Sequence, residues 1–253
     1  MPTILITGAS SGIGAALARR YAAPGTTLFL LGRDEKRLAE VAHSAAMLGA
    51  KAQAVCADVT NAAEMAQKLI ELDKESPIDL VIANAGISAG TGGGQETREQ
   101  VLAIFRTNVD GVFNTIQPLI PLMKARGRGQ IALMASLAGF RGLAGAPAYM
   151  ASKAAVRVYG EGLRGELAPF GVAVSVICPG FVKTPMTEVN RFKMPFLISA
   201  DRAGNIIKNG LEKNRPRISF PWPMVFLVWG MTTLPVAWTD GLLNRLPRKG
   251  SCG

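Results

Sequence analysis

Short apolar runs alternate along this chain with longer segments of helical character. A parallel sheet needs this alternation, because a crossover of a dozen or more residues, usually a helix, must separate one strand from the next. Six runs are predicted as strands, with a helix between each and the next: residues 3–7, 28–31, 52–55, 78–83, 130–135 and 172–177. The fold class is therefore α/β, with a doubly wound, mostly parallel sheet flanked by helices.

The alternation continues without an internal repeat or a linker as far as the sixth strand, and a last strand is expected at Arg217–Phe220. At 253 residues, the chain is long enough for one large sheet domain. We predict one domain over residues 1–220, with a substrate lid within residues 186–215. Residues 221–253 are predicted to form an apolar and basic extension.

The first strand leads into a glycine-rich loop, and a helix follows. Glycines let the backbone approach a pyrophosphate, and the amides at the start of the next helix face the anion. Strand, loop and helix in this order indicate a Rossmann-type dinucleotide site. The alternative is a tight turn of small residues that only serves packing. The predicted cofactor contacts are Gly8, Ser10, Ser11, Gly12, Ile13 and Gly14.

The end of the second strand bears on the choice of dinucleotide. An acid at this place binds the ribose 2′-hydroxyl of NAD, whereas an arginine accommodates the 2′-phosphate of NADP. Gly32 occupies the place of the acid, and Arg33 follows it. Asp34 is predicted to cap the next helix. We therefore predict NADP(H), with NAD(H) as the alternative, and the alternative for Arg33 is a solvated surface residue.

Ligands of such a sheet bind at the carboxyl ends of its strands. Three further strand ends carry candidate cofactor contacts: Asp58 and Val59, then Asn84, Ala85 and Gly86, then Pro179 and Gly180. With only His43 and three cysteines without paired spacing, no metal site is predicted.

Ser136 ends the fifth strand, and Tyr149 and Lys153 lie four residues apart on the helix that follows. Residues at this spacing share one helix face. An ammonium beside a phenol lowers the tyrosine pKa and fits it to transfer a proton, while the Ser136 hydroxyl could hold the oxygen of a carbonyl. The alternative is a surface tyrosine and lysine that are close by chance.

With these motifs in order, the chain resembles the short-chain dehydrogenase/reductase family, in its shorter single-domain branch. The resemblance covers residues 3 to about 185 and departs from the usual pattern at Ala83, where many members carry asparagine. It implies that Pro179 to Thr184, including Val182, lies beside the nicotinamide. It also implies a catalytic set of Asn108, Ser136, Tyr149 and Lys153.

The resemblance implies hydride transfer between NADP(H) and a carbonyl or alcohol, with Tyr149 as general acid and base. Lys153 would bind the nicotinamide ribose and lower the Tyr149 pKa. Asn108 would disturb its own helix, predicted over residues 96–123, and hold a water that links Lys153 to solvent. The substrate is expected to be apolar or lipid-like. A non-catalytic NADP(H)-binding sensor and a membrane-surface scaffold on the same fold are the other functions to weigh.

The last quarter of the chain carries most of its net positive charge. The net charge is +10, and from Arg191 onward ten lysines and arginines stand against three acids. No nucleic-acid module accompanies them, so nucleic acid is not the expected partner. Pro221 to Trp238 is uncharged, with three tryptophans, and its prolines disfavour a spanning helix. It is expected to line the substrate pocket, to enter a subunit interface or to lie on an anionic membrane, with Arg215, Arg217, Arg245, Arg248 and Lys249 flanking it.

The compartment is predicted from the cysteines and the amino terminus. Unpaired cysteines fit a reducing compartment, and the sequence starts without a cleavable signal pattern. We expect a cytoplasmic protein, a homodimer or homotetramer, with peripheral contact to the inner face of a membrane if the tail binds lipid. Cys56 and Cys178 are expected to be buried.

Overall fold

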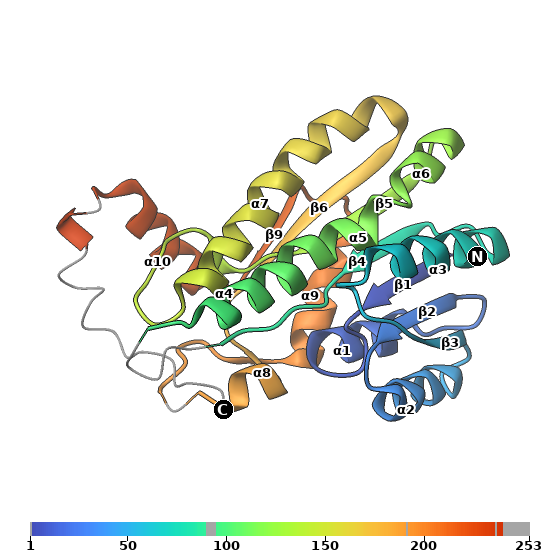
Figure 1. Ribbon diagram of the computed structural model, residues 1–253, viewed down its shortest axis with the longest axis horizontal. Helices are drawn as coiled ribbons and strands as arrows, with labels where there is room; N and C mark the ends of the chain where they lie inside the picture. The colour runs from blue at the N-terminus through green and yellow to red at the C-terminus, as the bar shows by residue number, and fades with distance from the viewer. Residues whose placement is uncertain (1, 90–94, 191, 236, 240–253) are drawn as a thin grey trace.

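The structure is a computed structural model that describes residues 2–89, 95–190, 192–235 and 237–239. Seven strands of the described chain form one parallel sheet in the order β3-β2-β1-β4-β5-β6-β9 (Figure 1). The strands are β1 (Thr3–Thr7), β2 (Thr27–Gly32), β3 (Lys51–Cys56), β4 (Leu80–Ala83), β5 (Gly129–Met134), β6 (Val172–Pro179) and β9 (Arg217–Phe220). The predicted doubly wound α/β fold is confirmed, and its order reverses between β1 and β4.

Helices cover both faces of this sheet (Figure 1). Their bounds are α1 (Gly12–Tyr21), α2 (Glu35–Ala46), α3 (Ala62–Glu75), α4 (Arg98–Phe105), α5 (Gly111–Ile116), α6 (Ile120–Arg126), α7 (Pro147–Leu167), α8 (Pro185–Glu188), α9 (Ala200–Glu212) and α10 (Trp222–Thr233). A separate small ribbon joins β7 (Val182–Lys183) and β8 (Ile198–Ser199). Short 3-10 turns follow β5 (Leu137–Gly139) and α7 (Ala168–Phe170).

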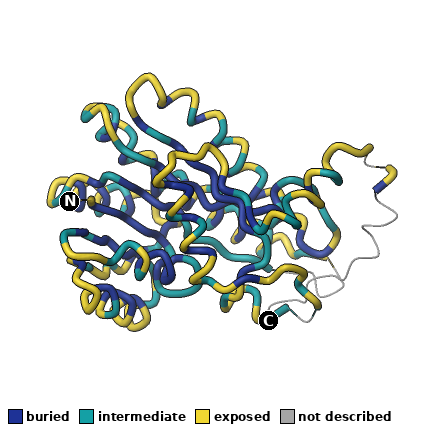
Figure 2. Tube along the Cα trace, turned by 180° about the vertical axis from the view of Figure 1, so that it is seen from behind, coloured by how far each residue is buried: buried dark blue, intermediate teal, exposed yellow. Residues whose placement is uncertain are grey.

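Two apolar clusters hold the three layers together, one on each face of the sheet. Side chains alternate between the faces of a strand, so Leu5 of β1 packs with α3, α5 and α7, while Ile4 and Ile6 pack with α1, α2 and α9. Figure 2 shows the buried residues running through the middle of the molecule, with exposed residues on the outer surfaces of the helices. Because both faces are covered, the central strands are mostly apolar.

The prediction of one continuous helix over residues 96–123 is wrong, because the helix is interrupted. A π-helical turn, η1 (Arg106–Asp110), separates α4 from α5, and α6 begins after a further break. The π turn contains Asn108, so the disturbance that the resemblance implied for this helix is present. Such turns inside α-helices frequently lie at functional sites.

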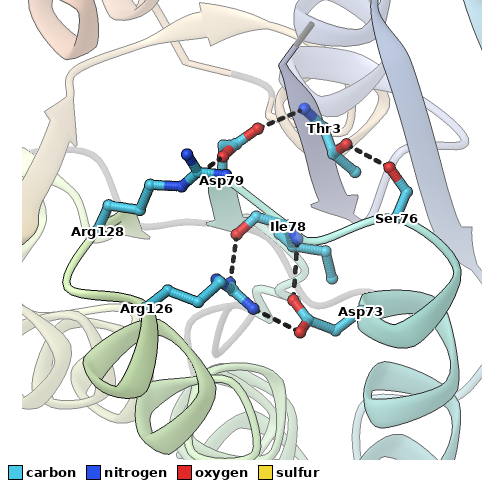
Figure 3. Close-up of polar contacts among 7 residues, drawn as sticks. All are labelled: Thr3, Asp73, Ser76, Ile78, Asp79, Arg126 and Arg128. Carbon is cyan, nitrogen blue, oxygen red and sulfur yellow. Dashed lines mark hydrogen bonds and ion pairs between the residues drawn. The ribbon is translucent and has the colours of Figure 1, made fainter.

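Strand β4 begins two residues later than predicted, because polar side chains bind the backbone of Ile78 (Figure 3). Its N–H donates to Asp73 Oδ1 at 2.9 Å, and its carbonyl accepts from Arg126 Nη2 at 3.0 Å. Arg126 also pairs with the buried Asp73 carboxylate, and the Asp79 carboxylate accepts the N–H of Thr3 at 3.0 Å. These contacts tie α3, α6, β1 and β4 together at the amino ends of the strands, away from the ligand-binding edge.

Helix α9 belongs to the layer of α1. Ala203, Gly204 and Ile207 are buried in it, and its contacts with α1 are extensive. It contributes no residue to the lining of the pocket described below, whereas Met186 and Thr187 do. A lid over the substrate therefore stays a prediction for the segment that precedes α9.

The two described cysteines differ in burial. Cys178 is buried in β6 as predicted, but Cys56 is exposed. The prediction for Cys56 is wrong because β3 is an edge strand, in which most residues reach solvent.

Candidate active site

A single pocket runs along the carboxyl ends of the strands and brings together nearly all of the predicted site residues. From the predicted set it is lined by Gly8, Ser10, Ser11, Gly12, Ile13, Arg33, Asp58, Val59, Asn84, Ala85, Gly86, Ser136, Tyr149, Lys153, Pro179, Gly180, Val182 and Thr184. The pocket lies at the reversal of strand order, where ligands of doubly wound sheets bind. Two predicted residues, Gly14 and Asn108, are absent from the lining and lie behind it.

The glycine loop is packed so tightly that side chains could not replace its glycines. A Cβ on Gly14 would lie 2.2 Å from the carbonyl oxygen of Gly8, and one on Gly8 would lie 2.8 Å from Ala85 Cα. Gly8 also has a φ of +64°, which side-chain-bearing residues rarely adopt. The loop thus holds the start of α1 directly against the end of β1.

The amino end of α1 is built to receive an anion. Its N-cap residue Ser11 makes no side-chain capping bond, and its first turn has no acidic residue. The partial positive charge of the helix end therefore faces the pocket through Gly12 and Ile13, which line it.

Asn84 holds the loop in place. Its amide Nδ2 donates to the carbonyl oxygens of Thr7 at 2.9 Å and Gly8 at 3.2 Å. The Thr7 hydroxyl accepts the N–H groups of Asn84 and Ala85, both at 3.1 Å. The end of β4 is thereby fixed to the end of β1. Ala83, which stands where many family members carry asparagine, is buried in the sheet, and these contacts do not involve its side chain.

Arg33 and Arg37 line the same end of the pocket. Asp34 caps α2 as predicted, accepting the Arg37 N–H at 3.0 Å and pairing with its guanidinium. These bonds from Arg37 hold the pKa of Asp34 below its usual value. Arg33 is mostly exposed and lies 3.9 Å from Asp58, a distance typical of a weak surface contact. Arg37 was missed by the sequence reasoning, because it lies a full helical turn beyond the end of β2.

Ser136, Tyr149 and Lys153 come together in the middle of the pocket. Ser136 is hydrogen-bonded to Tyr149, and its hydroxyl also donates to the carbonyl oxygen of Pro179 at 3.3 Å. Lys153 is buried, and its Nζ donates to the carbonyl oxygen of Met134 at 2.8 Å. The Lys153 Nζ lies 5.9 Å from the centre of the Tyr149 ring, so the two side chains share one helix face as predicted.

The pKa values of this pair depend on burial. Burial raises the pKa of Tyr149, and the hydrogen bond with Ser136 opposes the rise. Burial lowers the pKa of Lys153 to about 8. The expectation that Lys153 lowers the Tyr149 pKa below its usual value is therefore not met in this structure, because loss of water around the phenol outweighs the other influences.

Asn108 is fully buried at the π turn and uses its amide to fix the neighbouring loop. Its Oδ1 accepts the N–H of Ile87 at 2.8 Å, and its Nδ2 donates to the carbonyl oxygen of Ile87 at 2.9 Å. Nδ2 also donates to the Ser152 hydroxyl at 3.0 Å, and that hydroxyl donates to the carbonyl oxygen of Tyr149 at 2.7 Å. Asn108 thus connects α4–α5 to the turn of α7 that bears Tyr149. Ser152 was missed, although its place between the two candidates was visible in the sequence.

Comparison with known proteins agrees with this geometry. The family profile described as short chain dehydrogenase matches residues 2–194. An uncharacterized oxidoreductase of Myxococcus xanthus is 39% identical over 96% of this chain and 97% of its own length. A ketoacyl reductase of Nostoc is 36% identical over 77% of this chain and 69% of its own length.

Among solved structures, a short-chain dehydrogenase from Sphingobium yanoikuyae in complex with NADPH superposes with a TM-score of 0.82. It is 29% identical, and the match covers 100% of this chain and 99% of the other. The matched profile spans the glycine loop, the strand ends and the Tyr149 helix alike. This chain therefore belongs to the short-chain dehydrogenase/reductase family and is an NAD(P)-dependent oxidoreductase.

Proposed function

We propose that this enzyme interconverts an apolar ketone or aldehyde and the corresponding alcohol, with NADP(H) as cofactor and Tyr149 as general acid and base. One observation carries the proposal. The Tyr149 hydroxyl is hydrogen-bonded to Ser136, and its ring centre lies 5.9 Å from the Nζ of the buried Lys153, in the pocket that the glycine loop also lines. A binding module would not need a proton donor, an oxygen ligand and a buried cation together at this place.

The residues fit a dinucleotide. The free amino end of α1 and the closely packed Gly8 loop suit a pyrophosphate, which needs amide donors and close backbone approach. Thr184 and Val182, with Pro179 and Gly180, would hold the nicotinamide side. When bound, the nicotinamide supplies or accepts the hydride. The protein's part is to position it and to handle the proton.

Reduction needs a protonated donor, and the environment of Tyr149 keeps it protonated. Because burial raises its pKa, the phenol holds its proton at neutral pH and can give it to the substrate oxygen. Ser136 would hold that oxygen through its hydroxyl, as an oxyanion ligand does. The ammonium of Lys153, which is the major form below a pKa of about 8, would stabilise the phenolate that remains. Oxidation of the alcohol runs through the same groups in reverse.

The preference for NADP(H) rests on two arginines. Asp34, the carboxylate after β2 that lines the pocket, is occupied by its bonds to Arg37 rather than left for the ribose hydroxyl. Arg33, mostly exposed beside Gly32, is available to form a charge-assisted bond to a 2′-phosphate. Arg37 adds a second positive charge at the same end of the pocket.

The proposed substrate class follows from the walls near Tyr149. Met134, Ala135, Gly180 and Met186 line the pocket there, and Met224 of α10 packs directly against Gly180. These walls offer little to a charged substrate. The name of the Nostoc relative, a ketoacyl reductase, agrees with an apolar acyl group beside the carbonyl.

The quaternary structure and the compartment belong to the same proposal. The exposed Val158 and Phe170, which lie on or just after α7, could be covered in a homodimer or homotetramer. Two free cysteines suit the reducing cytoplasm. Sedimentation of the purified protein checks the first point.

A cofactor and substrate panel tests the reaction itself. Purified protein is mixed with NADPH or NADH and with carbonyls graded in apolar character, and consumption of reduced cofactor is followed. Turnover should be faster with NADPH and should rise with the apolar character of the substrate. Tight NADPH binding without turnover of any carbonyl or alcohol would favour the non-catalytic sensor instead.

A further inference from the structure

Two arginines and a glutamate gather around the ring of Phe140, the residue that follows the 3-10 turn Leu137–Gly139. The guanidinium carbon of Arg157 lies 4.5 Å from the ring centre, and that of Arg217 lies 5.2 Å from it. Glu161 pairs with both arginines, and its two carboxylate oxygens each lie 3.1 Å from Arg157 Nη1. We call these four residues the Phe140 cluster. It connects α7, which supplies Arg157 and Glu161, to β9, which supplies Arg217.

Arg157 binds the turn directly. Its Nε donates to the carbonyl oxygen of Gly139 at 3.3 Å, while Nη1 is held by Glu161 one helical turn further along α7. The Arg157 side chain is only 19% exposed, and a cation over an aromatic ring is attracted more strongly when it is desolvated. Arg157 therefore joins the end of the turn to the middle of α7.

The contact at Gly139 shows how closely the turn lies against α7. A Cβ on Gly139 would lie 2.7 Å from the carbonyl carbon of Lys153 and 2.8 Å from the amide nitrogen of Ala154. The backbone of the turn thus rests on the backbone of the helix, at the residue that bears the buried ammonium. A turn that moved away from α7 would break the Arg157 bond together with this contact.

The same turn begins at Ser136. The Ala138 N–H donates to the Ser136 hydroxyl oxygen at 3.1 Å, and the Gly139 N–H donates to the Ser136 carbonyl oxygen at 3.0 Å. The Ser136 hydroxyl is in turn bound to Tyr149 of α7 and to Pro179 of β6. Because Ser136 and Gly139 belong to one hydrogen-bonded turn, the position of Gly139 on α7 sets the place of the Ser136 hydroxyl.

We propose that Arg157 is a positioning residue of this enzyme, which fixes the turn on α7 and so keeps the Ser136 hydroxyl on the oxygen of Tyr149. Both ends of the turn are then held on one helix, Ser136 at Tyr149 and Gly139 at Arg157, about two helical turns apart. The inference rests on the proposed function only in the role of Ser136 as ligand of the substrate oxygen.

Arg217 extends the cluster toward the tail. It was predicted to flank the tail, and in the structure it opens β9, the strand that leads into α10, and pairs with Glu161. Val228 of α10 is buried in the apolar cluster against which Phe140 also packs. Within the described residues, no helix combines the length and the apolar character needed to cross a bilayer. Three other basic residues that were predicted to flank the tail lie outside the described residues: Arg245, Arg248 and Lys249.

The hydrogen bond between Ser136 and Tyr149 can be observed without substrate or cofactor. The chain has three tyrosines, Tyr21, Tyr149 and Tyr159, so tyrosine labelled with carbon-13 at Cζ gives three NMR signals, which Tyr21→Phe and Tyr159→Phe assign. The chemical shift of Cζ responds to the hydrogen bond at the phenol oxygen. The Ser136→Ala variant therefore provides the position of the Tyr149 signal when this bond is absent.

The Arg157→Met variant keeps an unbranched side chain but loses every donor. Its Tyr149 signal should move from the wild-type position toward the position in Ser136→Ala. With any carbonyl that the wild type reduces, kcat should fall about tenfold to a hundredfold, the effect of slightly misplaced reacting groups. The affinity for NADPH should stay unchanged, because the Phe140 cluster does not line the pocket.

Arg164→Met is the matched control on the same helix. Arg164 binds the carbonyl oxygen of Val174 and the side chain of Asn214, so this variant also loses an arginine with backbone and side-chain acceptors. Neither acceptor belongs to the turn after Ser136. The control should therefore leave both the Tyr149 signal and kcat as they are in the wild type.

Circular dichroism melting and NADPH binding establish which variants are folded. If Arg157→Met does not fold, Arg157→Lys takes its place, because lysine keeps a positive charge beside Glu161 and lacks the Nε donor. A Tyr149 signal at the wild-type position in the folded variant would overturn the proposal, as would an unchanged kcat or an equal displacement in Arg164→Met. A displaced signal in a protein whose wild type turns over no carbonyl would support the positioning of Ser136 and contradict the proposed reaction.

Discussion

The Nζ atom of Lys153 donates a hydrogen bond to the carbonyl oxygen of Met134, 2.8 Å away. This bond joins the face of α7 that bears Tyr149 to the carboxyl end of β5, two residues before Ser136. The lysine is therefore oriented by the sheet itself, and the ammonium is buried with a backbone carbonyl as its acceptor. Burial removes water from this charged group, and that loss lowers the pKa of Lys153 to about 8.

The first prediction concerns stability against pH. Between pH 8 and the ordinary value of 10.5 for lysine, the unfolded chain binds a proton that the native state has lost. Stability from this group therefore rises with pH across that interval, by up to about 3 kcal/mol from the shift of the pKa. The Lys153→Met variant should lack this rise. Urea unfolding without cofactor, from pH 7 to pH 10.5, measures the free energy of unfolding of both proteins. The value for the wild type should rise with pH relative to that of the variant. If the difference between the two values stays constant, the pKa of Lys153 is not lowered in the folded protein.

The second prediction assigns the proton. The Tyr149→Phe variant should lose turnover by at least about a hundredfold, because general acid catalysis contributes this much or more. Its affinity for NADPH should stay within about twofold, since the phenol hydroxyl is the group removed. Initial rates and fluorescence titration with NADPH measure the two quantities.

The Tyr159→Phe variant is the matched control for this change. Tyr159 lies on the same helix and packs edge-on against Phe113, outside the pocket lining. It should retain nearly full activity. If Tyr149→Phe keeps more than about a tenth of the wild-type rate, another group supplies the proton.

The third prediction concerns the cofactor. The Arg33→Ala variant should bind NADPH about tenfold to a hundredfold more weakly and NADH about as before, because a hydrogen bond between charged groups contributes about 1.5–3 kcal/mol. Arg128→Ala, at the opposite end of the strands and exposed, should change neither affinity. If the affinities for NADPH and NADH fall equally, Arg33 has only a structural role, and Arg37 should then be tested in the same way.

The sequence was sufficient to predict the sheet and most of the pocket, because glycine and strand-end positions follow from local rules. Strands alternate with helices, their carboxyl ends meet at one edge, and Gly8 and Gly14 can be recognised from the loop in which they stand. The prediction that Asp34 caps helix α2 also follows from a local rule, and the structure confirms it.

Other features depend on contacts between distant segments. The π turn at Asn108 arises where a buried amide binds Ile87 and Ser152, which lie 21 and 44 residues away. The raised pKa of Tyr149 depends on how completely neighbouring elements remove water, and spacing along one helix does not give that. The packing of helix α9 beside α1 is another such feature, because apolar spacing predicts which face of a helix is buried and not against which partner that face packs.

The last prediction compares two glycines of the chain. In Gly14→Ala, the new methyl group would lie 2.2 Å from the Gly8 carbonyl oxygen, so either the loop or the start of α1 must move. NADPH affinity should fall at least about tenfold, since close approach of this loop is what a pyrophosphate requires. In Gly162→Ala, on α7, nothing lies within 4 Å of the new methyl group. That variant should gain roughly 0.5–1 kcal/mol of stability from better helix propensity and bind NADPH as before. NADPH titration and urea unfolding of both variants provide the measurements, and equal NADPH affinity in the two would show that the packing of Gly14 against Gly8 does not shape the cofactor site.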